Sequence, residues 1–120
     1  KQDNKNEIEI WGTGKPKREF LFVDDLARAI LIIDKKYNQS SPINVGFGKD
    51  ISIKDLAYKL KKLFKYNGKI KFNTNFPDGT PRKLLDITRL KNLGWKSSIG
   101  LEDGLNQTYN WYLKENHLKN

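Results

Sequence analysis

Hydrophobic and polar residues recur at regular intervals along the chain, and these intervals predict its strands and helices. Alternation with a period of two predicts short strands at residues 7–11 ("EIEIW") and 69–73 ("KIKFN"), and an apolar run ending in glycine predicts a buried strand at 42–48. Apolar positions three and four residues apart predict helices at residues 24–36, 52–64, 86–93 and 101–116. The order β-α-β-α-β-α-α indicates an α/β protein with short strands, too few for a complete doubly wound sheet.

The predicted helices differ in how much of their surface is apolar. Residues 52–64 place their apolar side chains on one face and most of their lysines elsewhere, and Ser52 with Asp55 resembles a capping box. Residues 24–36 ("DDLARAILIIDKK") leave little polar face, which predicts a helix buried on most sides. Asp24 is the expected N-cap, and Asp25 the expected partner of the positive end of the helix dipole. An acid/base pair is the alternative reading of these two aspartates, but adjacent residues on a helix do not face each other.

Composition limits the classes of function. The 120 residues suffice for one small domain, and the net charge of +9 favours either an anionic partner or simply solvated, lysine-rich helix faces. The chain has no cysteine and one histidine, His117, so disulfides and thiolate chemistry are excluded and we expect no metal site. No apolar run approaches the roughly 20 residues of a membrane span, and no signal-peptide pattern opens the chain. We therefore expect a cytoplasmic protein without membrane contact.

Two glycine-containing stretches look like nucleotide loops but do not fit the patterns. "GTGKPKRE" supplies Gly12 and Gly14, but position 17 has no glycine, and Pro16 sits where a backbone N–H should point at phosphate. "GFGKDI" fails the dinucleotide fingerprint because Ile51 replaces the third glycine. The Tyr-x-x-x-Lys spacing at Tyr58 falls on the solvated face of its helix, so we interpret it as chance. The sequence therefore predicts no catalytic residues and no cofactor-binding residues on this chain.

Two basic loops are the strongest candidates for a binding site. The first, residues 12–18, contains the cationic side chains Lys15, Lys17 and Arg18. The second, "DGTPRK" from Asp78 to Lys83, also combines glycine with cationic side chains. Arginine can grip a phosphate with two N–H groups, lysine acts as a mobile point charge, and Trp11 beside the first loop could stack on a ring. The alternative is two ordinary basic surface loops, and the residues alone leave both open.

Three stretches give the chain a resemblance to a known family. They are "WGTGKPKREFLFVDDLARAI", "INVGFG" and "PDGTPRKLLDITRLKNLGW". The chain resembles the extended short-chain dehydrogenase/reductases of the NAD-dependent epimerase/dehydratase group, and in particular the C-terminal part of the GDP-L-fucose synthase family. The likeness runs from about residue 7 to residue 113. "REF-x-x-VDD" is shared widely among sugar-nucleotide epimerases and dehydratases, whereas "PDGTPRK-LLD" followed by "LGW" is narrower.

The resemblance implies a small α+β-like lobe, residues 7–116, that binds a GDP-sugar. Enzymes of this family epimerise GDP-4-keto-6-deoxy-mannose at C3 and C5 and reduce it at C4 with NADPH. Their NADP and their catalytic residues lie in an N-terminal Rossmann domain, which nothing in this chain matches. By position, Trp11 and Arg18 match substrate-binding residues, Lys83 matches the basic residue near the diphosphate, and Asp78 lies in the same loop. The resemblance also implies that the full-length enzyme is a homodimer.

These expectations define the chain's organisation and its alternatives. We expect residues 1–6 to be a disordered end and 117–120 a polar tail. Since the composition includes no methionine and the chain begins within a pattern, we expect a piece of a longer protein, inactive alone. A related enzyme acting on another nucleotide sugar, such as a GDP-heptose, would leave the same pattern. A nucleic-acid-binding module would need aromatic residues interleaved with lysines, whereas Phe64 and Tyr109 occupy core-periodic positions, so we expect no nucleic-acid partner.

Overall fold

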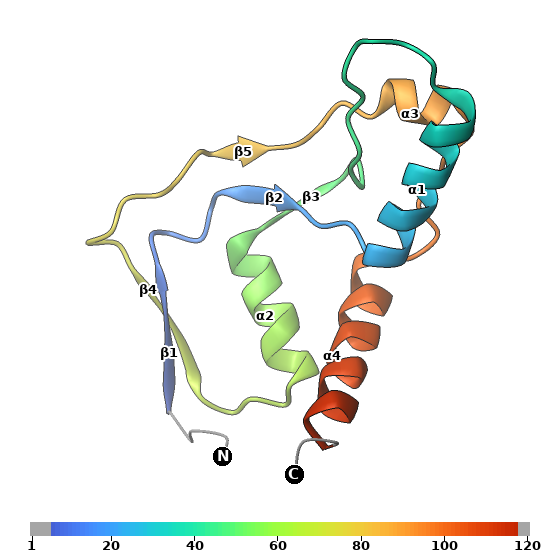
Figure 1. The fold of residues 1–120 in the computed structure, drawn as a ribbon. Coiled ribbons are helices and arrows are strands. Elements are labelled where there is room, and N and C mark those ends of the chain that lie inside the picture. The colour runs from blue at the N-terminus through green and yellow to red at the C-terminus, as the bar shows by residue number, and fades with distance from the viewer. Residues whose placement is uncertain (1–5, 118–120) are drawn as a thin grey trace. The chain divides into compact units, whose positions relative to one another are not determined.

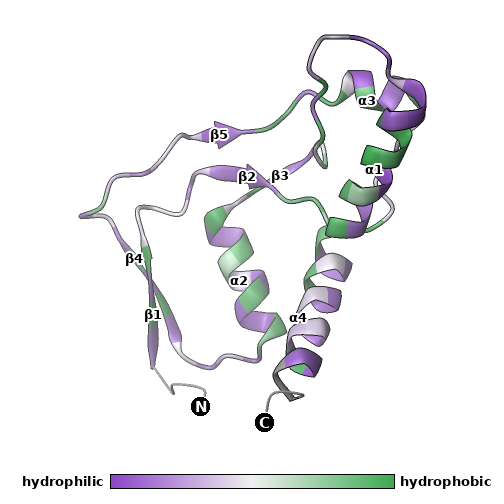
Figure 2. Cartoon of the chain, in the orientation of Figure 1, coloured by the Kyte–Doolittle hydropathy of each residue, from purple (hydrophilic) through white to green (hydrophobic). Residues whose placement is uncertain are grey.

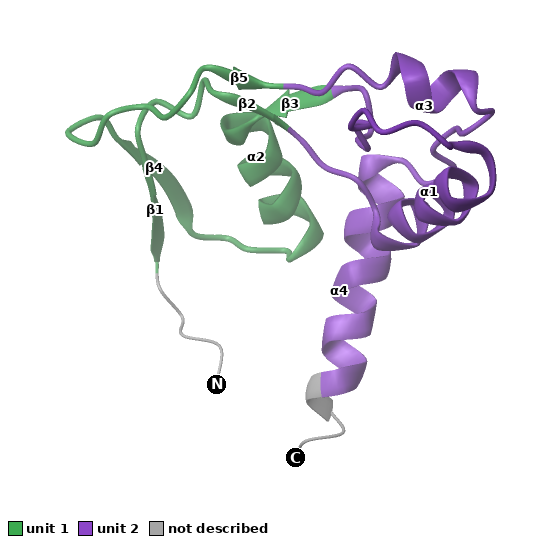
Figure 3. Cartoon of the chain, turned by 45° about the horizontal axis from the view of Figure 1, so that its top comes forward, with its two compact units in different colours: residues 1–18, 50–83 green, residues 19–49, 84–120 purple. Residues whose placement is uncertain are grey.

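A computed structural model shows that the chain folds into two compact units (Figure 3). The first combines residues 1–18 with 50–83, and the second combines 19–49 with 84–120. The structure describes residues 6–117, with Asn116 and His117 described by their backbone alone. The predictions of a disordered N-terminal end and a polar C-terminal tail therefore fall almost wholly outside the described residues. The mixed α/β class, with short strands and four helices, is confirmed (Figure 1).

The first unit is built on two parallel strands, β1 (Glu7–Trp11) and β4 (Lys69–Asn73). Their register runs from Glu7 opposite Lys69 to Trp11 opposite Asn73. Both strands show the alternating pattern that predicts them, and both predictions are confirmed. Because the strands are parallel, the loops that follow them leave from the same end of the pair (Figure 1).

A second sheet has three shorter strands in the order β3-β2-β5. Its strands are β2 (Lys17–Glu19), β3 (Asp50–Ser52) and β5 (Arg82–Lys83). β2 and β5 are parallel, with Lys17 opposite Arg82 and Arg18 opposite Lys83. The expectation of an unbroken loop at 12–18 and at 74–83 was wrong at these ends. Both stretches finish in short strands. The sequence did not reveal these strands, because two or three residues are too few to show a periodic pattern.

Helix α2 (Ile53–Leu63) follows β3 directly, as its pattern predicts. Ser52 is the N-cap: its Oγ accepts the backbone N–H of Asp55 at 3.0 Å and donates to the Asp55 carboxylate at 2.6 Å. The apolar face of the helix is half-buried; of its lysines, Lys54 and Lys62 are exposed, and Lys59 and Lys61 are half-buried. Tyr58 and Lys62 are both exposed, which agrees with the interpretation of their spacing as chance.

The second unit holds the other three helices and the hydrophobic core. They are α1 (Val23–Lys36), α3 (Thr88–Asn92) and α4 (Leu101–His117). The core is a cluster of four buried side chains, Ala29, Ile87, Leu90 and Trp95, with half-buried aliphatic residues packed around it. Gly94, at a φ of +89°, ends α3 in the left-handed conformation that glycine tolerates best. Gly94 therefore acts as the stop of this helix.

Sequence predictions in this unit were wrong for three segments. Residues 42–48 form no strand: the N–H of Gly48 bonds to the Glu19 carboxylate at 3.0 Å, and the carbonyl of Pro42 accepts from the Arg89 guanidinium at 3.2 Å. Side chains thus satisfy backbone groups that a sheet ladder would otherwise satisfy. The helix predicted from Asp86 starts later, at Thr88, because Asp86 accepts the N–H of Thr88 in a turn before it.

The third error concerns α1. Its N-cap is Phe22 rather than Asp24, and no side chain caps it. Within the described residues, only Asp25 and Ala29 of this helix are buried, so the prediction of burial on most sides was wrong for this chain. Hydrophobic stretches along α1 are visible in Figure 2, and exposed side chains include Val23, Leu26, Ile30 and Leu31.

Asp25 lies in the first turn of α1, as predicted, and its carboxylate has a further role. Its side chain has an exposed fraction of 0%, and it pairs with Arg28 one helical turn later. It also accepts the backbone N–H of Ser98 and of Ile99, each at 3.0 Å, and the Ser98 hydroxyl at 2.9 Å. Burial acts to raise the pKa of this carboxyl, but the hydrogen bonds from Arg28, Ile99 and Ser98 outweigh it and hold the pKa below its usual value. Asp25 therefore joins α1 to the segment before α4 as an ionised, fully hydrogen-bonded group.

Candidate functional site

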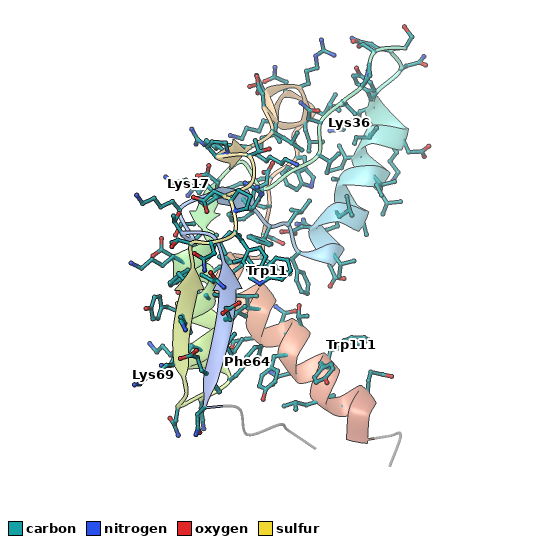
Figure 4. All side chains as sticks on the ribbon, turned by 90° about the vertical axis from the view of Figure 1, so that its left-hand side faces the viewer. Trp11, Lys17, Lys36, Phe64, Lys69 and Trp111 are labelled. Carbon is teal, nitrogen blue, oxygen red and sulfur yellow. The ribbon has the colours of Figure 1, made fainter. Side chains whose placement is uncertain are left out.

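The four residues singled out by the sequence all lie in the first unit. Trp11 ends β1 and Arg18 lies in β2, while Asp78 and Lys83 belong to the stretch that follows β4. In Figure 4, Trp11 lies at the end of the strand pair opposite to Lys69, toward Lys17. Parallel pairing of β1 and β4 accounts for this, because it sends residues 12–16 and 74–81 out from the same end. The two basic loops predicted separately therefore lie side by side in the first unit.

A carboxylate holds the two loops together. Asp78 accepts the backbone N–H of Thr13 at 2.7 Å with one oxygen and the Thr13 hydroxyl at 2.6 Å with the other. These bonds, first the hydroxyl and then the N–H, lower the pKa of Asp78, and nearby Lys15 acts in the same direction. The N–H of Gly12 also bonds to the carbonyl of Asn73 at 2.8 Å. Asp78 therefore fixes where the first loop stands relative to the second.

Two glycines permit this close approach. Gly12 and Gly14 have φ values of +82° and +73°, which residues other than glycine rarely adopt. A Cβ on Gly12 would collide with the Asp78 carboxylate, and one on Gly14 would collide with the Phe72 ring. Both glycines therefore shape the turn that brings the first loop against Asp78.

The two candidate anion-binding side chains are opposite each other across a strand pair. Arg18 and Lys83 are register partners in β2 and β5, so their side chains leave the same face of the small sheet. Nη1 of Arg18 donates to the carbonyls of Lys17, at 2.6 Å, and Thr80, at 2.8 Å. The guanidinium is thereby tied to the second loop. Arg82 leaves the other face and pairs with Asp50 instead.

Trp11 lies at the edge of this site as an exposed aromatic ring. It stacks on Phe76, with ring centroids 4.3 Å apart and an interplanar angle of 13°. Its exposed fraction is 68% and that of Phe76 is 38%. Sequence reasoning named Trp11 but missed Phe76 and Thr13. The available signal for Phe76 was a single aromatic residue inside a polar loop, "TNFPDG".

The described residues include neither a cluster of metal ligands nor a membrane-spanning helix. No group of three or more metal-ligating side chains occurs within 6–115. Over the same part of the chain, no helix is both long and apolar enough to cross a bilayer. What the site does offer is two cationic side chains, ordered loops and an exposed indole, which suits an anion carrying a ring.

Replacing Asp78 with alanine tests the loop contact. We expect the chain to remain folded, because Asp78 is exposed, and its stability to fall by about 1 kcal/mol, the usual net value of such hydrogen bonds. The backbone N–H groups of Thr13 and Lys15 should exchange faster with solvent, since both lie in the turn that Asp78 holds. Amide exchange measured by NMR checks this. Unchanged exchange in residues 12–15 would show that the carboxylate does not order the loop.

Comparison with known proteins gives these residues a context. Residues 1–46 match the family model described as the NAD dependent epimerase/dehydratase family. A putative GDP-L-fucose synthase 2 from Arabidopsis thaliana is 47% identical over 114 residues, which cover 95% of this chain and 35% of that protein. The chain thus spans about a third of the length of the curated relatives it matches.

Solved structures agree with the sequence match. A GDP-L-fucose synthetase from Naegleria fowleri bound to NADP has a TM-score of 0.85 at 26% identity, over 92% of this chain and 36% of that one. A GDP-6-OMe-4-keto-L-xylo-heptose reductase from C. jejuni has a TM-score of 0.82 at 39% identity, over 91% of this chain and 34% of that one. The family resemblance seen in the sequence therefore agrees with the family model over residues 1–46 and with the similarity to GDP-L-fucose synthases over 95% of the chain.

Proposed function

We propose that this chain binds the GDP end of a nucleotide sugar for an enzyme that epimerises and reduces GDP-4-keto-6-deoxy-mannose with NADPH. The observation that carries the proposal is the register of β2 and β5, which puts Arg18 and Lys83 on one face. Trp11 lies at the edge of the same pair of loops. Relatives called GDP-L-fucose synthases, similar over nearly the whole of this chain, support the choice of substrate.

The two cationic side chains suit a diphosphate. A guanidinium has five N–H donors, and Nη1 of Arg18 is occupied by backbone carbonyls, which leaves Nη2 and Nε for phosphate oxygens. Anchoring by Nη1 also restricts the rotamers of the side chain, so less entropy is lost when an anion binds. Lys83 adds a point charge from the neighbouring strand. In this proposal Asp78 belongs to the site by holding the Thr13 turn in place.

The chain contributes to the reaction by positioning. Binding the nucleotide far from the reacting carbons holds the sugar in the geometry that the chemistry requires. We propose that the catalytic groups and the NADP lie outside this chain, so the chain alone should not oxidise NADPH. We also propose that the complete enzyme acts as a homodimer.

A related sugar is the second candidate. The similarity to a GDP-heptose reductase extends over 91% of the chain at 39% identity. The groups described here would contact the nucleotide, and a heptose could occupy the same position as a deoxyhexose. We therefore propose GDP as the nucleotide, and either a deoxyhexose or a heptose as the sugar.

Thermal unfolding tests the nucleotide assignment. We expect 1 mM GDP to raise the Tm of the chain, because a ligand that binds only the folded state stabilises it by mass action. UDP and a single-stranded oligonucleotide at matched charge should shift Tm much less. An equal shift with all three would reduce the site to a general anion surface and contradict the proposal.

A further inference from the structure

We propose that Phe76 is a positioning residue that holds the Trp11 ring flat so that its outer face can stack on the nucleobase of the bound nucleotide. This deepens the proposed function and rests on it. Nothing in the resemblance pointed to Phe76. The rings of Trp11 and Phe76 are stacked, with centroids 4.3 Å apart and an interplanar angle of 13°.

The position of Phe76 is fixed by backbone contacts. Trp11 is the register partner of Asn73. The Asn73 side chain accepts the N–H of Asn75 at 3.1 Å, and the Asn73 carbonyl accepts the N–H of Phe76 at 3.4 Å. This turn brings the chain back beside the strand end, so strand register and turn together place Phe76 against Trp11.

The pair leaves one face of the indole for a ligand. Phe76 covers one side of Trp11, yet 68% of the tryptophan stays exposed. Covering the exposed face of the indole with a ligand ring would remove apolar surface from water. The stacked Phe76 ring already restricts the Trp11 rotamers, so less entropy is lost when a ligand binds. Stacking on a base is a use that this geometry permits.

The charge nearby identifies the class of ring. The same two loops carry Arg18 and Lys83, which suit phosphate oxygens. A ligand that carries both an anionic group for these cations and a flat ring for Trp11 is a nucleotide. A purine offers a larger stacking surface than a pyrimidine, so this platform favours GDP over UDP.

The experiment compares GDP with inorganic pyrophosphate, each titrated into the chain by calorimetry. In wild type, GDP should bind more tightly than pyrophosphate. Phe76→Ala should weaken GDP binding by about fivefold, part of the usual contribution of one stacked base, and leave pyrophosphate binding within about twofold. Phe76→Tyr should restore GDP affinity, since a tyrosine ring can stack in the same way.

Two controls make the result specific. Tyr58→Ala removes another exposed aromatic side chain of the first unit and should leave both affinities unchanged. The near-UV circular dichroism of Phe76→Ala should change without a change in the far-UV spectrum, because the environment of Trp11 alters while the helices remain. These spectra also establish that the variant is folded.

Each outcome decides a different point. Unchanged GDP affinity in a folded Phe76→Ala variant, or equal losses for GDP and pyrophosphate, would overturn the positioning role while the diphosphate site stands. Wild-type binding of pyrophosphate as tight as GDP would overturn the ring platform. Wild type that binds neither probe would overturn the proposed function, and with it this inference.

Discussion

Replacing Asp25 with alanine should lower the free energy of unfolding by about 3 kcal/mol, the range for breaking one side of a buried ion pair. The substitution leaves the backbone N–H groups of Ser98 and Ile99 without their carboxylate acceptor. Unsatisfied donors of this kind cost about 1–3 kcal/mol each when water cannot reach them. Arg28 is half-exposed and can be rehydrated, which keeps the loss from being larger. Urea unfolding followed by circular dichroism measures the change.

The neighbouring aspartate is the matched control. Asp24 is exposed, so Asp24→Ala should change the free energy of unfolding by at most about 0.5 kcal/mol, as surface substitutions usually do. Equal losses at the two positions would mean that burial of Asp25 adds nothing to what an aspartate in the first helical turn contributes. That result would contradict the buried-carboxylate account.

The same variant series should show a pH signature. The folded-state pKa of Asp25 lies below its ordinary value of about 3.9, so its contribution is fully present above that pH. It is lost as the pH falls below about 4 and through the folded-state pKa, where the carboxyl takes up a proton. Asp25→Asn should therefore lose less stability than wild type over that acid range. Some slope should remain in the variant, because hydrogen bonds also lower the pKa values of Asp50, Asp78 and Asp86.

Replacing Arg18 with alanine should weaken GDP binding by about 10- to 100-fold, because a hydrogen bond to a charged group contributes roughly 1.5–3 kcal/mol. Arg18→Lys should recover only part of the loss, since an ammonium keeps the charge but cannot bond to phosphate and to the Thr80 carbonyl in the same geometry. Isothermal titration calorimetry of the variants with GDP gives the affinities.

Arg82 supplies the control for charge alone. It is the next strand residue to Lys83, carries the same charge as Arg18, and leaves the opposite face of β5 to pair with Asp50. Arg82→Ala should reduce GDP affinity by no more than about twofold, since a solvent-exposed charge on another face is largely screened. Equal losses for Arg18→Ala and Arg82→Ala would show that net charge, rather than the Arg18–Lys83 face, attracts the nucleotide.

Periodic elements were predictable from the sequence, whereas non-periodic ones were not. β1, β4 and α2 show alternation or 3.6-residue spacing, and each lies where the pattern predicts it. The run at 42–48 is apolar enough for a strand, but Glu19 satisfies its glycine N–H from elsewhere in the sequence. Asp25 looks identical to Asp24 in the sequence, and only the packing of residues 98–99 against it makes it a buried carboxylate.

The candidate site shows the same division. Residue type and the family resemblance identified Trp11, Arg18, Asp78 and Lys83. Their convergence depends on the parallel pairing of β1 with β4, which lie about sixty residues apart, and local patterns carry no information about that pairing. The contacts of Thr13 with Asp78, and of Phe76 with Trp11, follow from it and could not be predicted earlier.

Hydrogen–deuterium exchange with and without saturating GDP tests most directly whether these two loops are the nucleotide site. The account predicts slower exchange in residues 11–18 and 76–83, where the ligand would contact Trp11, Arg18 and Lys83. It predicts no change at residues 58–63 of α2, which also carry lysines but lie beyond the first turn, whose N–H groups bond to the first loop. Protection on α2 with none in the two loops, or no protection anywhere, would contradict it.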